Sequence, residues 1–180
     1  MELFITLAQN LLIGYGGATI LFLIITLCYS PFRALKNAYL SISNVIAMVI
    51  GVLLAIAIAW NYLIVIPHAV DDSYFRYPKM HIALIVILTG IIPLLFLYDK
   101  YRKNIVFTLL MATLMTIGCF YERIFYFITS FFRTFRDHLP SSWAYYRGSY
   151  MEIISWPLGY FLVMLILASI KMKLANAQLS

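Results

Sequence analysis

Charged residues are scarce in this chain, and their scarcity argues against a soluble fold. Only 11% of the 180 residues are charged, while 64% are hydrophobic. Soluble domains usually carry about 25% charged residues. The composition therefore predicts a polytopic membrane protein. The net charge of +6 then indicates basic loops at a membrane face, and we expect no nucleic-acid partner.

Cysteine and histidine are also too few for most metal sites. The two cysteines, Cys28 and Cys119, lie in apolar runs, whereas zinc and iron–sulfur sites use about four ligands. We expect each thiol to be buried and inert. His68, His81 and His138 lie at or near the ends of apolar runs. A haem held by two membrane-embedded histidines is therefore not expected. We also expect no metal site, with ligation by the three histidines as the weaker alternative.

Five apolar runs are long enough to cross about 30 Å of hydrocarbon, which takes about 20 helical residues each. They are Phe4–Tyr29, Ser41–Ile66, Met80–Tyr98, Ile105–Phe132 and Ile153–Met172. Runs of this length are typical of membrane helices. We therefore predict a single all-α transmembrane domain over residues 1–180. About five helices would form a four-helix bundle plus one closing helix.

Prolines and small residues predict how these helices begin, bend and pack. Ser30–Pro31 is expected to end the first helix, because proline cannot continue a helix. Ser41, Ser43 and Asn44 are expected to open the second helix. Pro93 predicts a kink in the third helix, and Pro157 a first-turn proline in the last. A small-residue face on the first helix predicts close helix packing: Gly14, Gly16, Gly17 and Ala18.

Basic residues are divided unevenly between the two ends of the predicted bundle. The first loop, the third loop and the C-terminus together hold seven Lys/Arg and one acid. The N-terminus and the second and fourth loops hold five Lys/Arg and several acids. Lys and Arg concentrate in cytoplasmic loops. We therefore expect the N-terminus outside and the C-terminus in the cytoplasm.

One acid–base pair, Glu122–Arg123, lies inside an apolar run. A charge near the bilayer centre costs about 2.5–3.5 kcal/mol, so each member needs a partner. Tyr126 follows Glu122 by one turn, and we expect Asn61 and His81 in the same outer third of the bundle. One interpretation is a proton-accepting or quinone-headgroup site open to the outer side. The other is a polar pair that locks this helix to its neighbours or to another subunit.

The region around this pair resembles a known family. The residues are Ile117–Gly118, then Tyr121–Arg123, then the run Arg136–Trp143 (RDHLPSSW), followed by Tyr146. This pattern is similar to the C-terminal half of polysulfide-reductase-type (NrfD-like) membrane subunits, most closely those of alternative complex III. The resemblance covers roughly Tyr77–Lys173.

The resemblance implies a subunit of a quinone- or quinol-linked respiratory complex in the bacterial cytoplasmic membrane. Because the chain carries no cofactor ligands, we expect this subunit to be non-catalytic. Such a subunit binds no redox cofactor itself and lies beneath periplasmic iron–sulfur and multihaem cytochrome subunits, beside other membrane subunits. Six residues are then candidate contacts with partner subunits: Arg136, Asp137, His138, Ser141, Ser142 and Trp143. The alternative, based on the polar residues of the outer third, is a small transporter or proton-conducting module.

Overall fold

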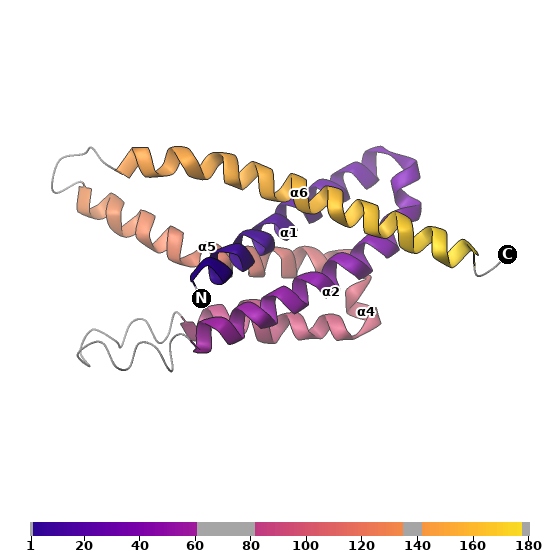
Figure 1. Ribbon diagram of the computed structural model, residues 1–180, viewed down its shortest axis with the longest axis horizontal. Helices are drawn as coiled ribbons and strands as arrows, with labels where there is room; N and C mark the ends of the chain where they lie inside the picture. The colour runs from indigo at the N-terminus through magenta and orange to yellow at the C-terminus, as the bar shows by residue number, and fades with distance from the viewer. Residues whose placement is uncertain (1, 61–81, 135–141, 178–180) are drawn as a thin grey trace.

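The computed structural model describes residues 2–60, 82–134 and 142–177, which are almost entirely helical and contain no strand (Figure 1). Side chains are described within residues 3–60, 82–120 and 154–177. The long helices are α1 (Glu2–Cys28), α2 (Ser30–Trp60), α5 (Ile105–Thr134) and α6 (Ser142–Ala177). Between α2 and α5 come a helical turn at 82–86, the π-helix η3 (Ile87–Ile91), the 3-10 helix η4 (Ile92–Leu97) and the single turn α4 (Asp99–Arg102).

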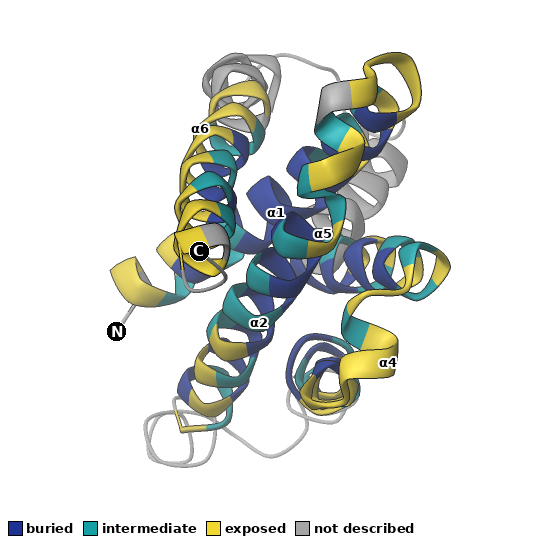
Figure 2. Ribbon diagram, turned by 90° about the vertical axis from the view of Figure 1, so that its right-hand side faces the viewer, coloured by how far each residue is buried: buried dark blue, intermediate teal, exposed yellow. Residues whose placement is uncertain are grey.

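Helix α1 is central and packs against α2, α5 and α6 (Figure 2). Its residues Leu12, Tyr15, Ala18 and Phe22 are all fully buried. They recur every three or four residues, so they lie on one side of the helix. Phe22 stacks on Tyr39 of α2, with ring centroids 3.7 Å apart. The core therefore follows α1, and the other long helices are arranged around it.

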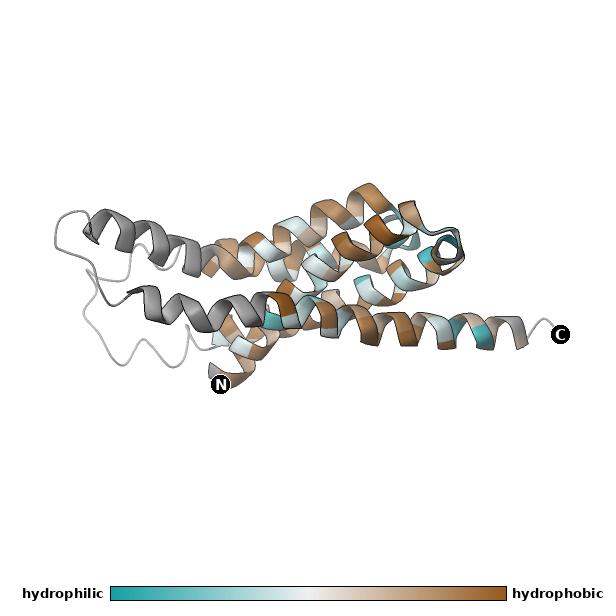
Figure 3. Cartoon of the chain, turned by 90° about the horizontal axis from the view of Figure 1, so that it is seen from above, coloured by the Kyte–Doolittle hydropathy of each residue, from teal (hydrophilic) through white to brown (hydrophobic). Residues whose placement is uncertain are grey.

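Three helices are long and apolar enough to cross a membrane: Leu3–Cys28, Phe32–Trp60 and Ile154–Ala175. Two further apolar stretches are shorter: Ile82–Leu97, and Ile105–Phe120, which is the part of α5 whose side chains are described. Hydrophobic residues cover much of the described helices, including their outward faces (Figure 3). Such helices need apolar surroundings. The chain is therefore an α-helical membrane protein, and a count of about five spans stays a prediction.

The second helix begins earlier than predicted. Helix α1 ends at Cys28, and α2 begins at Ser30 after the single residue Tyr29. Ser41 therefore lies inside α2 and does not open it. Pro31 fits this arrangement, because a residue in the first helical turn needs no backbone N–H for the helical ladder.

The last helix also begins earlier than predicted, at Ser142 instead of Ile153. Pro157 consequently lies in the interior of α6 and is not a first-turn residue. The helix continues past Pro157 at the cost of one backbone hydrogen bond. The proline ring packs where α6 crosses α1: a Cβ atom added to Gly17 would lie 2.7 Å from Pro157 Cγ.

Pro93 lies where the third helical segment changes its winding. It follows the π-helix η3 and occupies the first turn of the 3-10 helix η4. Proline lacks the N–H that the α-helical ladder would use at this point. Pro93 therefore lies at a change of helix type, and the kink expected there stays a prediction.

The small residues of α1 allow close helix contacts, as predicted. A Cβ atom on Gly14 would lie 2.9 Å from the carbonyl oxygen of Trp156 in α6, and one on Gly16 would overlap Thr116 Oγ1 of α5. Gly51 likewise allows α2 to approach η3 closely, because a Cβ atom there would overlap the Thr89 carbonyl. Small residues let helix backbones approach closely in membranes.

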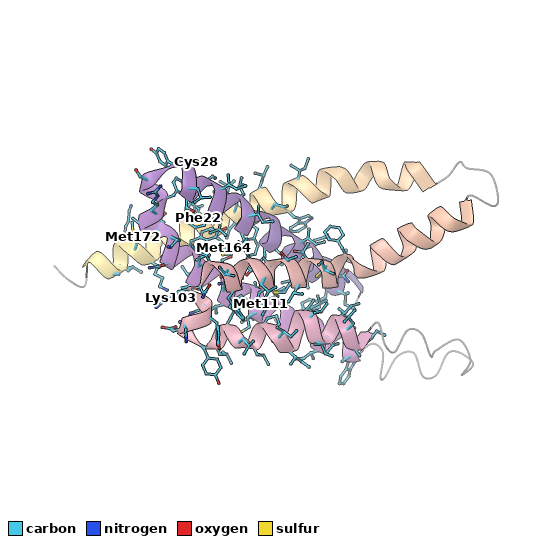
Figure 4. All side chains as sticks on the ribbon, turned by 180° about the vertical axis from the view of Figure 1, so that it is seen from behind. Phe22, Cys28, Lys103, Met111, Met164 and Met172 are labelled. Atoms are coloured by element: carbon cyan, nitrogen blue, oxygen red, sulfur yellow. The ribbon has the colours of Figure 1, made fainter. Side chains whose placement is uncertain are left out.

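One end of the bundle, called the basic end here, collects seven basic residues: Arg33, Lys36, Lys100, Arg102, Lys103, Lys171 and Lys173. Asn44 of α2 donates to the Arg102 carbonyl at 2.8 Å, and Lys171 of α6 donates to Ser41 of α2 at 3.4 Å. Figure 4 shows Lys103, Met172 and Cys28 at this same end. The first loop, the third loop and the C-terminal end of α6 are thus together, as predicted, and their cytoplasmic side stays a prediction.

Candidate functional site

The acid–base pair predicted as the site lies in the second half of α5. Glu122, Arg123 and Tyr126 are all α5 residues. Glu122 follows Ile105 by seventeen residues, which is about 26 Å of helix. Since Ile105 lies beside α4 at the basic end, the pair lies far toward the opposite end (Figure 1). The contacts of these three side chains lie outside the described residues.

The remaining predicted site residues are divided between the start of α6 and undescribed positions. Ser142 and Trp143 begin α6. Six predicted residues lie outside the described ranges: Asn61, His81, Arg136, Asp137, His138 and Ser141. Helices α5 and α6 both pack against α1 and run to the end opposite the basic end (Figure 1). The backbone therefore places the Glu-Arg pair and Ser142–Trp143 on the two helices that flank residues 135–141.

A buried polar group that the sequence analysis did not single out joins four elements of the described bundle. The Tyr15 hydroxyl donates to Asn44 Oδ1 at 2.8 Å. Asn44 Nδ2 donates to Thr108 Oγ1 and to the Arg102 carbonyl, each at 2.8 Å. Asn44 is fully buried. These four residues, the Asn44 network, connect α1, α2, α4 and α5, and both amide hydrogens of Asn44 have acceptors.

A second group of hydroxyls lies where α1, α2 and α6 meet. The Tyr160 hydroxyl of α6 donates to the Ser43 carbonyl at 3.1 Å, and the Tyr39 hydroxyl donates to a backbone carbonyl of α1 at 3.5 Å. The rings of Tyr15 and Tyr160 meet edge to face at 5.9 Å. Tyr160 therefore brings α6 against the Asn44 network.

The chemistry of these buried groups is hydrogen bonding between neutral side chains and backbone. An unpaired polar group in hydrocarbon costs several kcal/mol, so each pairing holds its helices together. Within the described ranges, no three His, Cys, Asp or Glu side chains come together as a metal-ligand group. The buried polar side chains described here join neighbouring helices, and the charged residues of α5 are the candidates for further chemistry.

The Asn44 network was not predicted, because the second helix was expected to begin near Asn44 itself. Ser41, Ser43 and Asn44 were assigned to a helix start, since Ser and Asn are frequent N-caps. With α2 starting at Ser30, Asn44 lies fourteen residues further on, about four turns inside the helix. An asparagine at that depth in an apolar helix is the signal that could have identified the network.

The two cysteines have different surroundings. Cys119 is buried, as predicted, whereas Cys28 is exposed, and they are not joined to each other. The prediction for Cys28 is wrong because this residue ends α1, where the chain turns into α2 and leaves the packed interior.

Comparisons with known proteins give no relative for this chain. No family model matches it, and no curated protein or solved structure matches it.

Proposed function

We propose that the protein is an integral membrane subunit of a quinone- or quinol-linked respiratory electron-transfer complex. In this role it scaffolds the complex or shapes its quinone site, without a redox cofactor of its own. The observation that carries the proposal is the position of Glu122 and Arg123 inside α5 of an apolar membrane bundle. Charges placed in this way need a partner, such as a quinone headgroup or a group on another subunit.

The family motif supports this proposal and indicates where partners bind. Residues Arg136–Trp143 connect α5 to α6, the helix that Ser142 and Trp143 begin. The opposite end of the bundle is the basic end, which the positive-inside rule assigns to the cytoplasm. In a bacterial cytoplasmic membrane, the motif would then face the periplasm. Iron–sulfur and multihaem cytochrome subunits of the kind found with the family would bind there.

The described interior favours a subunit over the alternative, a transporter or proton-conducting module. The amide of Asn44 is engaged by Tyr15, Thr108 and the Arg102 carbonyl, so these polar groups bind one another. A conducting path needs groups that exchange partners with water or substrate. The described network instead ties helices together.

A mild-detergent pull-down from native membranes tests the proposal. We expect the tagged chain to be recovered with iron–sulfur and multihaem cytochrome subunits, identified by mass spectrometry and by a haem absorption spectrum. Recovery of the chain alone and colourless would contradict the proposal. Ion flux across vesicles that contain only this chain would establish the transporter alternative.

Glu122→Gln tests the contribution of the acid–base pair. It removes the charge of the carboxylate while preserving its shape, so we expect impaired complex assembly or quinol turnover. Asp71→Asn makes the same chemical change outside the apolar runs and should alter neither. If both variants behave like the parent protein, the pair has no role in the complex.

A further inference from the structure

Three lysines of the basic end lie on membrane-spanning helices. Lys36 belongs to the candidate span Phe32–Trp60, and Lys171 and Lys173 belong to Ile154–Ala175. Lysines near the ends of such helices keep their methylene stems on apolar surface and extend the ammonium group to the interface. Their charges therefore lie at the depth of the lipid phosphates.

Lys36 of α2 and Lys171 of α6 both lie on the basic-end side of the contact between these two helices. Tyr39, three residues after Lys36, has its ring centroid 6.3 Å from that of Phe161 in α6. Ala168, three residues before Lys171, is fully buried in the same core as Tyr39. Each lysine therefore lies one turn beyond the packed part of its helix, toward the basic end. We call this side of the contact the α2–α6 seam.

A hydroxyl group accompanies the two ammonium groups. Lys171 Nζ lies 3.4 Å from Ser41 Oγ, and Ser41 is 6% exposed. The Ser41 oxygen accepts this bond and keeps its own O–H as a donor. An ammonium group beside a hydroxyl donor matches the oxygens of a phosphate.

An apolar track continues from Lys171 along the outside of α6. Val163, Leu167 and Leu174 lie eight and four residues before Lys171 and three residues after it, so they share its side of the helix. All three are exposed, at 52%, 37% and 62%. A cation above an exposed apolar strip matches a lipid, which has a charged head and a hydrocarbon tail.

Three other basic side chains at this end have partners on the protein. Arg33 donates to the carbonyls of Thr26 and Leu27 in the last turn of α1. Arg102 and Lys103 form ion pairs with Asp99. No carboxylate in the described ranges pairs with the lysines of the seam. Charge is thus left uncompensated at the seam, whereas Asp99 partly neutralises Arg102 and Lys103 at α4.

We propose that the α2–α6 seam binds the headgroup of an anionic phospholipid. Lys36 and Lys171 hold the phosphate, the Ser41 hydroxyl donates to it, and an acyl chain lies along Leu167 and Val163. Basic sites between membrane helices bind anionic headgroups in this way. This inference is independent of the proposed electron-transfer role.

Native mass spectrometry of the full chain in mild detergent, titrated with phosphatidylglycerol or phosphatidylcholine, tests the site. We expect a retained phosphatidylglycerol molecule and no comparable retention of phosphatidylcholine. Lys36→Gln and Lys171→Gln should each weaken phosphatidylglycerol binding about five-fold. Lys171→Arg should preserve binding, because the charge remains.

Lys103→Gln is the matched control. It removes one positive charge from the same end of the bundle, but from a side chain already paired with Asp99. We expect less than a two-fold change. A loss equal to that of Lys171→Gln would show diffuse attraction by the basic end and overturn the site. Equal retention of phosphatidylcholine would also overturn it.

Discussion

Replacing Asn44 by alanine is expected to loosen four elements of the bundle at once. The substitution removes one bond from Tyr15, one to Thr108 and one to the Arg102 carbonyl, all at 2.8 Å. The Thr108 hydroxyl keeps its own bond to the Asn104 carbonyl. The Tyr15 hydroxyl and the Arg102 carbonyl lose the described partner that Asn44 provides.

The loss of stability in Asn44→Ala can be calculated from the number of hydrogen bonds that the substitution removes between helices. Hydrogen bonds between membrane helices contribute about 0.6 kcal/mol on average and about 1.7 kcal/mol at most. Three bonds of average strength give about 2 kcal/mol, and three of the strongest would give about 5 kcal/mol. The Tyr15 hydroxyl and the Arg102 carbonyl lose the partner that Asn44 provides, and a buried group without its partner costs more than the average bond. We therefore expect Asn44→Ala to lower the free energy of unfolding by about 2–3 kcal/mol.

Reversible unfolding in mixed micelles, with an increasing fraction of dodecyl sulfate, measures this change by circular dichroism. Thr113→Val is the control, because the exposed Thr113 donates only within α5, to the Leu109 carbonyl. That variant should stay within about 0.5 kcal/mol of the parent. Tyr15→Phe should destabilise the parent but add little to Asn44→Ala, because both remove the same bond. An Asn44→Ala protein as stable as the control, or fully additive effects, would refute the network as a source of stability.

Two further predictions follow from packing and exposure. Gly17→Ala should destabilise the protein by about 1–3 kcal/mol, because the added methyl group meets Pro157. Gly159→Ala, with nothing within 4 Å of the added carbon, should be neutral or slightly stabilising. Equal stabilities of the two variants in the same micelle assay would contradict the contact between Gly17 and Pro157. Cys28 should react with a membrane-impermeant maleimide in inverted vesicles and not in right-side-out cells, while Cys119 should stay protected in both until the protein unfolds. Labelling of Cys28 from outside the cell would contradict the predicted orientation and indicate the opposite one.

The general architecture could be predicted from the sequence because few backbone structures can span a lipid bilayer. Apolar runs of about twenty residues in a chain with 11% charged residues predict helices. The small residues Gly14 and Gly16 likewise indicate close contacts, because only such side chains let helix backbones approach. These features depend on local composition, which a single sequence shows directly.

Helix starts and buried partners were harder to predict, because they depend on distant residues. Helices α2 and α6 begin at Ser30 and Ser142, well before the apolar runs begin, because polar residues can also be part of a helix. The role of Asn44 depends on Thr108, which is 64 residues away in the chain. The depth of Glu122 in α5 could be counted from residue numbers, but its partners could not.

The Asn44 network also bears on the order in which the chain assembles during synthesis. Its partners lie 29, 58 and 64 residues from Asn44 along the chain, one before it and two after it. Tyr15 is already in place when α2 enters the bilayer, so α1 and α2 can pair as a hairpin first. The amide hydrogens of Asn44 have no acceptors in the network until α4 and α5 have been translated. A nascent hairpin of α1 and α2 therefore carries two unpaired donors in lipid until the rest of the chain has been inserted.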